Sequence, residues 1–327
     1  MLSSAVSSLR STDIFSTPFR GERKVYDIRQ DLLYALDPSR YVKSLKFSSF
    51  AWQDAVLKSP AKRIVIDGCR QSGKSTIISA LPCHHAKYYP KSLSIILAPT
   101  EDQSKEDMIK VKNFISMDSS YPEVKRYASD QVELRNGSRI LIIIATDKAA
   151  RGYSAPDLIV IDEASRVPDI VYSSGVRAML TDNRQARLIV ISTPFGQQGF
   201  FWKAMTQGKS WERYYIRSPY SVDPEDSYSL HEYPGGEAAF QAQQQDLGVR
   251  AWFSPRHSNL QEQQEQLEEI GKQQYEQEMC GMFVEAEGMV FGYDEINAAF
   301  STACTPLTAG SDADISFAPP PPWMKEA

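Results

Sequence analysis

The sequence has few of the residues that build metal clusters, disulfide frameworks or membrane spans. Its 327 residues include 4 cysteines and 4 histidines. The cysteines lie far apart and form no CxxC pair, which argues against structural zinc and against a disulfide-stabilised fold. The N-terminus lacks the apolar segment of a signal peptide, and no apolar run approaches the ~18 residues that span a membrane. We therefore expect a reduced, intracellular protein.

Acidic and basic residues are distributed unevenly along the chain. The formal net charge is −5, but residues 1–100 carry 15 Lys and Arg against 7 Asp and Glu. The rest of the chain carries 21 against 34. The basic N-terminal third is a candidate surface for a polyanion such as DNA, although a solvated basic surface explains the same counts equally well.

Strand-like and helix-like segments alternate through the first two thirds of the chain. Compact aliphatic runs predict buried strands at 63–67, 92–99, 157–162 and 186–193. Helical patterns lie between them, and Asn136-Gly137 predicts a hairpin over 131–145. This alternation predicts an α/β fold with a mostly parallel sheet covered by helices. Beyond residue 205 the alternation fades, and a Gln/Glu-rich helix is expected at 259–279.

The stretch GCRQSGKST, at residues 68–76, carries the clearest chemistry. It fits the pattern G-x-x-x-x-G-K-[ST] at Gly68, Gly73, Lys74 and Ser75. Glycines let such a loop turn its backbone N–H groups onto phosphate oxygens, and the following helix directs its positive dipole end at the same anion. A predicted strand precedes the motif and a predicted helix follows it, as a P-loop requires. Lys74 is expected to reach the β- and γ-phosphates of a nucleotide, and the Ser75 hydroxyl to ligate Mg²⁺.

A second motif, DLIVIDEAS at 157–165, follows the P-loop. Its buried strand delivers Asp162 at the carboxyl end, where ligands bind in open α/β sheets. Asp162 is expected to hold Mg²⁺ through water, and Glu163 to polarise a water for in-line attack on the γ-phosphate. The two motifs together predict a protein that hydrolyses ATP or GTP.

Three further segments narrow the class of P-loop protein. Ser192, Thr193 and Pro194 end another strand, and their hydroxyls are placed to sense the γ-phosphate, although a polar turn has the same composition. Arg151 lies in a loop upstream of the second motif, where it is either an arginine finger or a surface residue. In FSSFAWQDAV, Gln53 with Phe50 and Trp52 suits recognition of an adenine, or the aromatic side chains simply pack in the core.

The segments GCRQSGKS, APTEDQSKE, ARGYSAPDLIVIDEAS and ISTPFGQQGFFW, in this order and spacing, resemble the ATPase part of a tailed-phage terminase large subunit. The resemblance covers roughly residues 45–300. It implies an ASCE-type P-loop fold, with a mostly parallel central sheet flanked by helices and a small C-terminal helical lid. In that fold an extra strand lies between the P-loop strand and the Mg²⁺ strand, and we expect the segment 92–99 in that place.

The resemblance also implies roles for individual residues. The nucleotide, ATP, is expected to contact Gly68, Arg70, Gln71, Ser72, Gly73, Lys74, Ser75 and Thr76 of the loop. Ser75 and Asp162 would bind Mg²⁺, Glu163 and Lys74 would act in catalysis, and Gln53 would read the adenine. Ser192, Thr193 and Pro194 would form the coupling motif. Either Arg151, acting on a neighbouring subunit, or Arg70, inside the loop, would be the finger, and the sequence leaves this choice open.

The implied domains are an N-terminal arm and helix (1–44), the ATPase core (45–220), a lid or linker subdomain (221–300) and a tail (301–327). Terminase large subunits continue into a nuclease with metal-binding carboxylates. Asp312 and Asp314 either correspond to its first strand or belong to a short acidic loop, and the residues that follow are too few for that domain, so we expect no nuclease activity from this chain.

The leading hypothesis is an ATP-driven motor that translocates double-stranded DNA into a prohead. Its expected partners are DNA, a portal protein, a small terminase subunit and other copies of itself in a ring. The expected location is the host cell cytoplasm and not the mature virion. Two alternatives remain: a superfamily 2-like helicase, and an ATP-binding scaffold of a packaging complex that uses the helix at 259–279 as a partner surface.

Overall fold

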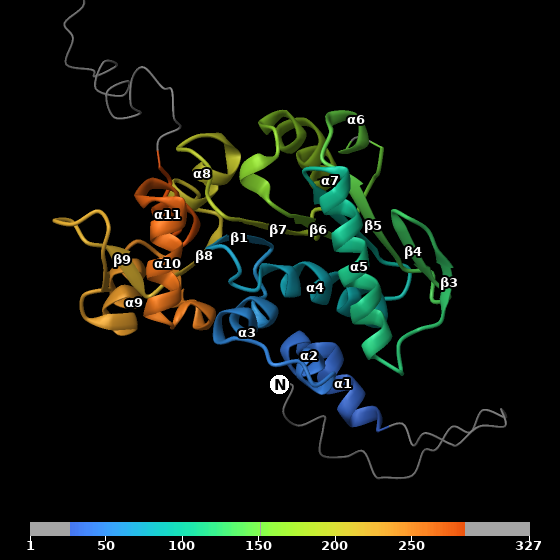
Figure 1. Ribbon diagram of the computed structural model, residues 1–327. Helices are drawn as coiled ribbons and strands as arrows, with labels where there is room; N and C mark the ends of the chain where they lie inside the picture. The colour runs from blue at the N-terminus through green and yellow to red at the C-terminus, as the bar shows by residue number, and fades with distance from the viewer. Residues whose placement is uncertain (1–26, 151, 285–327) are drawn as a thin grey trace, which may run out of the picture.

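A computed structural model of the chain describes residues 27–150 and 152–284. Its centre is a nine-stranded sheet with the strand order β11-β8-β1-β7-β6-β2-β5-β4-β3 (Figure 1). The strands are β1 (Arg63–Gly68), β2 (Leu93–Ala98), β3 (Val124–Tyr127), β4 (Gln131–Leu134), β5 (Arg139–Ile144), β6 (Leu158–Ile161), β7 (Arg187–Ser192), β8 (Glu212–Arg217) and β11 (Val249–Phe253). Neighbouring strands from β11 to β5 are parallel, and β4 joins β5 and β3 in antiparallel pairs. The predicted mostly parallel α/β sheet is confirmed.

Helices cover both faces of the sheet because successive strand residues point to opposite sides. One face, which includes Ile64 and Ile66 of β1, packs against α2 (Pro38–Ser44), α3 (Ala51–Lys58), α4 (Lys74–Tyr88) and α5 (Glu101–Met117). The other face, which includes Val65, packs against η2 (Val171–Val176), α7 (Arg177–Asp182) and α8 (Gly199–Thr206). The remaining short elements on this side are α6 (Asp147–Ala150) and η1 (Ala164–Arg166), while α1 (Ile28–Leu36) precedes α2.

The strand that separates β1 from β6 is β7, so the prediction that 92–99 occupies this place is wrong. The segment forms β2, which lies on the far side of β6. The crossover from β1 through α4 to β2 skips two positions, which β7 and β6 later fill. The order of strands in a parallel sheet depends on how far each crossover reaches, and the order along the chain does not reveal that distance.

The expectation that the strand pattern fades beyond residue 205 is also wrong. β8 and β11 extend the central sheet beside β1, and β9 (Tyr220–Val222) pairs with β10 (Leu230–Glu232) in a small second sheet. α9 (Gly236–Asp246) packs against β11. One edge strand of the main sheet therefore lies within the segment predicted to be a helical lid.

The Gln/Glu-rich segment forms two helices instead of one. α10 (Leu260–Ile270) and α11 (Lys272–Glu278) meet at Gly271, whose φ of +77° is costly for residues with a side chain. Leu267 and Tyr275 pack with Val222 into a small apolar cluster, and η3 (Pro255–His257) precedes α10. Figure 1 shows these helices stacked at one end of the sheet, beyond β8. Within the described ranges, no helix combines the length and apolarity that crossing a bilayer requires.

Candidate functional site

The P-loop joins β1 to α4 with the tight turn that its glycines predict. Gly73 caps α4 with a φ of +96°, and Gln71 also has a positive φ of +57°. A Cβ atom at Gly73 would lie 2.8 Å from the side-chain nitrogen of Gln53, so both conformation and space favour glycine here. The N-terminus of α4, which has no side-chain cap, opens into this loop.

Lys74 is buried at the base of the loop. Its ammonium group donates to the Gly68 carbonyl at 2.8 Å, to the Cys69 carbonyl at 3.1 Å and to Thr193 Oγ1 at 2.7 Å. The Thr193 hydroxyl in turn donates to the Gly68 carbonyl. No carboxylate forms an ion pair with Lys74 in the described part of the chain, so its direct partners are two carbonyl groups and a hydroxyl group. The predicted lysine and the predicted coupling motif are thus in direct contact.

A network of hydroxyl groups continues from Thr193 to Glu163. The Ser192 hydroxyl lies 3.2 Å from Glu163 Oε2 and 2.8 Å from the hydroxyl of Ser165. Ser165 Oγ donates to the Thr193 carbonyl, and its backbone N–H donates to Ser192 Oγ. The end of β7 and the turn after β6 are therefore held together, and Glu163 is connected to Lys74 through two residues. Pro194, the third residue of the predicted motif, is buried.

Glu163 has an unusual backbone conformation. Its φ of 44° and ψ of 46° lie in the left-handed region, which costs free energy in a residue with a side chain. This conformation turns the chain sharply at the end of β6, directly after Asp162. A strained residue at the carboxyl end of a parallel strand is typical of a functional position.

Asp162 lies in a cluster of buried carboxyl groups. Its Oδ1 accepts from the Glu163 backbone N–H and its Oδ2 from Gln103 Nε2, both at 2.9 Å. Burial, with the nearby charges of Asp107 and Glu163, raises the pKa of Asp162 to about 8. Burial also raises the pKa of Asp107, although Lys110 pairs with it at 3.1 Å. Carboxyl groups therefore outnumber the cationic groups that pair with them at this end of the sheet.

Gln53 lies against the P-loop and not in an open pocket. Its side chain is buried: Oε1 accepts from the Phe50 backbone N–H at 2.8 Å, and Nε2 donates to the Gly73 carbonyl at 2.9 Å. Trp52 is buried in the core. Gln53 therefore anchors α3 to the first turn of α4, and its adenine-reading role stays a prediction.

Of the two arginines predicted as candidate fingers, the structure describes only Arg70. Arg70 pairs with Glu278 of α11 at 2.8 Å, and its backbone N–H donates to the Glu278 carbonyl at 2.7 Å. This carboxylate raises the pKa of Arg70. Arg151 lies outside the described residues, as do Asp312 and Asp314. The choice between the two fingers therefore stays open.

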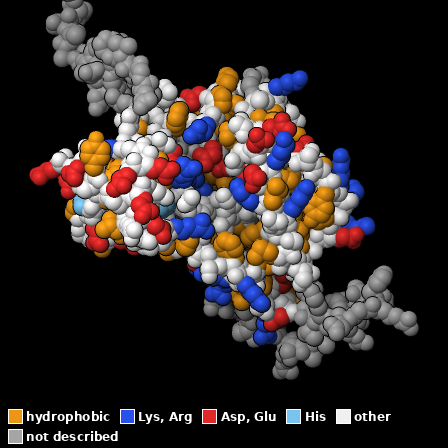
Figure 2. Space-filling view, viewed as in Figure 1, with side chains coloured by type: hydrophobic (Ala, Val, Ile, Leu, Met, Phe, Trp, Pro, Cys, Tyr) orange, Lys and Arg blue, Asp and Glu red, His pale blue; other side chains and the backbone are white. Residues whose placement is uncertain are grey.

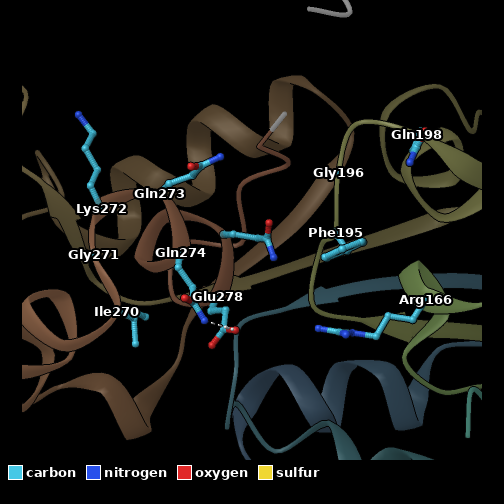
Figure 3. Close-up of a pocket in the computed structure, with 11 residues that line it drawn as sticks. Arg166, Phe195, Gly196, Gln198, Ile270, Gly271, Lys272, Gln273, Gln274 and Glu278 are labelled. Atoms are coloured by element: carbon cyan, nitrogen blue, oxygen red, sulfur yellow. Dashed lines mark hydrogen bonds between the residues drawn. The ribbon is translucent and has the colours of Figure 1, made fainter. Parts of the chain in front are cut away.

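A cleft of about 590 Å³ opens beside the loop. Arg166 and Phe195 line one side, and α11 and the end of α10 line the other, with Lys272, Gln274 and Glu278 (Figure 3). Since Glu278 also binds Arg70, the cleft adjoins the P-loop. Ser75 and Thr76 lie half-buried in the first turn of α4. The cleft is large enough for the polar part of a nucleotide.

Sequence reasoning missed Gln103, Asp107, Ser165 and Arg166. Ser165 ends the motif DLIVIDEAS and Arg166 is the next residue, so the sequence already placed both within three residues of Glu163. Gln103 and Asp107 are four residues apart, and this spacing places both on one face of α5. No sequence signal relates that face to Asp162, which lies more than fifty residues away.

Comparison with known proteins identifies a family and a fold for this chain. A family described as the N-terminal part of the terminase large subunit, T4likevirus-type, matches residues 65–298. The ATPase domain of the large terminase of Thermus phage P74-26 has a similar structure, with a TM-score of 0.55 and 20% identity. The match covers 75% of this chain and 98% of that one. A mutant form of the same domain gives a TM-score of 0.56 at the same identity and coverage.

At this identity the structural similarity establishes the fold alone, whereas the family match spans most of the chain and includes both motifs. The chain belongs to the family of T4-like terminase large subunits, and its residues 65–298 match the N-terminal part of those subunits.

Proposed function

We propose that this chain hydrolyses ATP and couples hydrolysis to the movement of double-stranded DNA into a viral prohead. The observation that carries the proposal is the path from Lys74 through Thr193 and Ser192 to Glu163. It joins the phosphate-binding lysine to the carboxylate that would activate water, and it passes through the segment expected to couple the two. Family membership supports the same function.

The residues divide the chemistry among them. The backbone N–H groups of the loop and the Lys74 ammonium would bind the β- and γ-phosphates, because a phosphate oxygen is a stronger acceptor than the carbonyls that Lys74 now contacts. Glu163 would orient a water for in-line attack and take its proton. When the phosphate leaves, Thr193 and Ser192 would sense the change through Lys74 and Glu163.

Mg²⁺ fits the donors at this site. The described residues contain no group of three or more His, Cys, Asp or Glu side chains arranged to hold a metal by themselves. Nucleotide-bound Mg²⁺ does not need such a group, because phosphates and waters supply most of its ligands. Ser75 and Asp162 would provide the protein's share, and a cation would offset the negative charge around Asp162. Bound there, Mg²⁺ would neutralise charge on the phosphates.

We further propose how the motor would bind DNA, where it would work and which proteins it would work with. The motor would bind DNA through its phosphates without reading bases, and it would work in the host cell cytoplasm with a portal protein and a small terminase subunit. It would act as a ring of identical subunits. A helicase of the superfamily 2 type is less favoured because β8 and β11 extend the first sheet, so the described residues hold no second P-loop-like sheet.

ATP hydrolysis, measured with and without double-stranded DNA, tests the proposal. The parent chain should hydrolyse ATP faster with DNA, and Lys74→Ala should lose at least about 10³-fold of that rate because phosphate charge is no longer stabilised. Arg177→Ala, an exposed change on α7, is the control. A rate that DNA leaves unchanged would favour the scaffold hypothesis, and a rate that survives Lys74→Ala would contradict the P-loop assignment.

A further inference from the structure

Arg166 is an exposed arginine beside the catalytic motif, and no ion pair joins it to a carboxylate within residues 27–150 and 152–284. Its guanidinium lies 5.1 Å from the centre of the Phe195 ring, an aromatic side chain that is itself 47% exposed. Figure 3 shows Arg166 extending from its turn into the cleft, toward the side that holds Glu278. A guanidinium that stacks on a ring but lacks an anion is available for an anionic ligand.

The backbone around Arg166 is attached to the groups that would contact the γ-phosphate. The Arg166 N–H donates to the Glu163 carbonyl at 2.9 Å, within the short turn η1. Ser165, the preceding residue, binds both Ser192 and Thr193, and Thr193 touches Lys74. Phe195 lies two residues after Thr193. Arg166 therefore belongs to the turn that contains Glu163, and Phe195 to the segment whose Thr193 contacts Lys74.

We propose that Arg166 is a catalytic residue supplied by the same subunit, and that it contacts the γ-phosphate as the phosphoryl group is transferred. The proposal rests on the proposed ATPase function and adds a residue to it. Phe195 is a positioning residue, because it holds the guanidinium by stacking and contacts no reacting atom. Arg70, by contrast, is already paired with Glu278.

Arg166 would assist the transfer of the γ-phosphoryl group from ATP to water. A water oxygen forms a bond to the γ-phosphorus while the bond from that phosphorus to the bridging oxygen of ADP breaks, and ADP keeps the electron pair. One proton of the water passes to Glu163. In the transition state, negative charge is spread over the three equatorial oxygens of the phosphoryl group. A guanidinium, whose donors form a planar fork, can donate hydrogen bonds to two of them.

The test separates binding of ADP from binding of the transferring phosphoryl group. Affinity for ADP, affinity for ADP with aluminium fluoride, and kcat and KM for ATP are measured on the parent chain with Mg²⁺. The same measurements are made on Arg166→Ala, Arg166→Lys, Phe195→Leu and the control Arg177→Ala. Aluminium fluoride imitates the phosphoryl group in transfer, so its complex reports on Arg166 even where turnover is slow.

Arg166→Ala should lower kcat and the affinity for the fluoroaluminate complex by about 10²- to 10³-fold, with ADP affinity and KM within about threefold of the parent. Arg166→Lys should recover only part of the loss, because a point charge cannot replace the fork. Phe195→Leu should lower kcat by about tenfold, because it removes the cation–π contact that holds the guanidinium in place. Arg177→Ala should match the parent.

Two results would overturn the assignment. Fluoroaluminate affinity and kcat of Arg166→Ala within about threefold of the parent would show that the side chain does not contact the γ-phosphate. An equal loss of ADP affinity would show that it binds the ground state or supports the fold. Failure of the parent chain itself to bind ADP would instead contradict the proposed function, and the assignment would fail with it.

Discussion

The two sides of the candidate site carry side chains of opposite charge, and these side chains differ in how fully other groups of the protein pair with them. On the P-loop side, Lys74 is surrounded by two carbonyls and a hydroxyl, and Arg70 is paired with Glu278. On the acidic side, Asp162 and Asp107 are buried together with few donors. The Lys74 and Arg70 side chains therefore have partners within the protein, whereas the burial of the Asp162 and Asp107 carboxyl groups is only partly offset by hydrogen bonds and ion pairs.

This difference shows in the ionisation of the acidic side. One oxygen of Asp107 has no hydrogen-bond partner, and the pKa of Asp162 is raised to about 8 by burial and by its acidic neighbours. The acidic side therefore carries an electrostatic cost that a bound cation would relieve. Changes on this side should consequently have larger effects than changes at the paired arginine.

The largest expected effect concerns Glu163. Glu163→Gln keeps the shape and polarity of the side chain but removes the base, so kcat for ATP should fall by about 10²- to 10⁴-fold. ADP affinity should change little, since Glu163 is expected to contact water and not the nucleotide. Steady-state hydrolysis and fluorescent-ADP titration check both statements. Intact turnover would show that another group activates the water.

The second prediction concerns Asp162 and pH, without Mg²⁺ or nucleotide. Because its folded-state pKa is raised, its contribution to stability is present at low pH, below the unfolded value near 4, and is lost as pH rises through about 8. Asp162→Asn should therefore be more stable than the parent at pH 9 by at least about 1.4 kcal/mol, the equivalent of one pKa unit.

The difference between Asp162→Asn and the parent should shrink toward pH 4, where the parent carboxyl is protonated as well. Chemical denaturation across this pH range measures it. Asp182→Asn, at an exposed position at the end of α7, is the control and should show no such trend. A parent that is as stable as Asp162→Asn at pH 9 would mean that the cluster is better compensated than its contacts indicate.

The third prediction concerns the network between the two sides. Ser192→Ala removes the hydroxyl near Glu163 and leaves that of Ser165 with fewer partners, so unfolding free energy should fall by about 1–3 kcal/mol. kcat should fall about tenfold, because Glu163 loses a group that orients it. Ser116→Ala, at an exposed position of α5, controls for loss of a hydroxyl. Unchanged kcat would separate the network from catalysis.

The smallest expected effect concerns the arginine side. Glu278→Gln removes the charge that faces Arg70 but keeps the backbone contact between the two residues. Arg70 is 59% exposed, so solvent screens the pair and the loss of stability should be below about 1 kcal/mol. Denaturation at low and high salt checks this, and the difference should disappear at high salt. A larger loss would mean that α11 depends on this pair.

The residues that the sequence identified most readily are those whose function depends on neighbours in the chain. The P-loop is one turn with its flanking strand and helix, so Gly73 and Lys74 could be recognised from spacing alone. The acidic pair at the end of β6 is equally local. The strand order and the place of 92–99 could not be read in this way, because both depend on the reach of crossovers.

The C-terminal part shows where local patterns stop being informative. β8 (ERYYIR) and β11 (VRAWF) contain charged and aromatic residues, so neither resembles the aliphatic runs of β1 or β2. β8 becomes a strand because the edge of β1 offers backbone donors and acceptors that must be paired, and β11 pairs in turn with the edge of β8. Such pairing is decided by tertiary structure, even where the segment's own preference is weak.

By itself, the sequence determined that this protein has a P-loop, an acidic strand end and a hydroxyl-rich strand end, because each is a run of adjacent residues. Only the tertiary structure decided that Thr193 contacts Lys74, that burial beside Asp107 raises the pKa of Asp162, and that Arg166 stacks on Phe195. These contacts join residues that different crossovers bring to one edge of the sheet. Folding alone sets their distances, and local spacing carries no record of them.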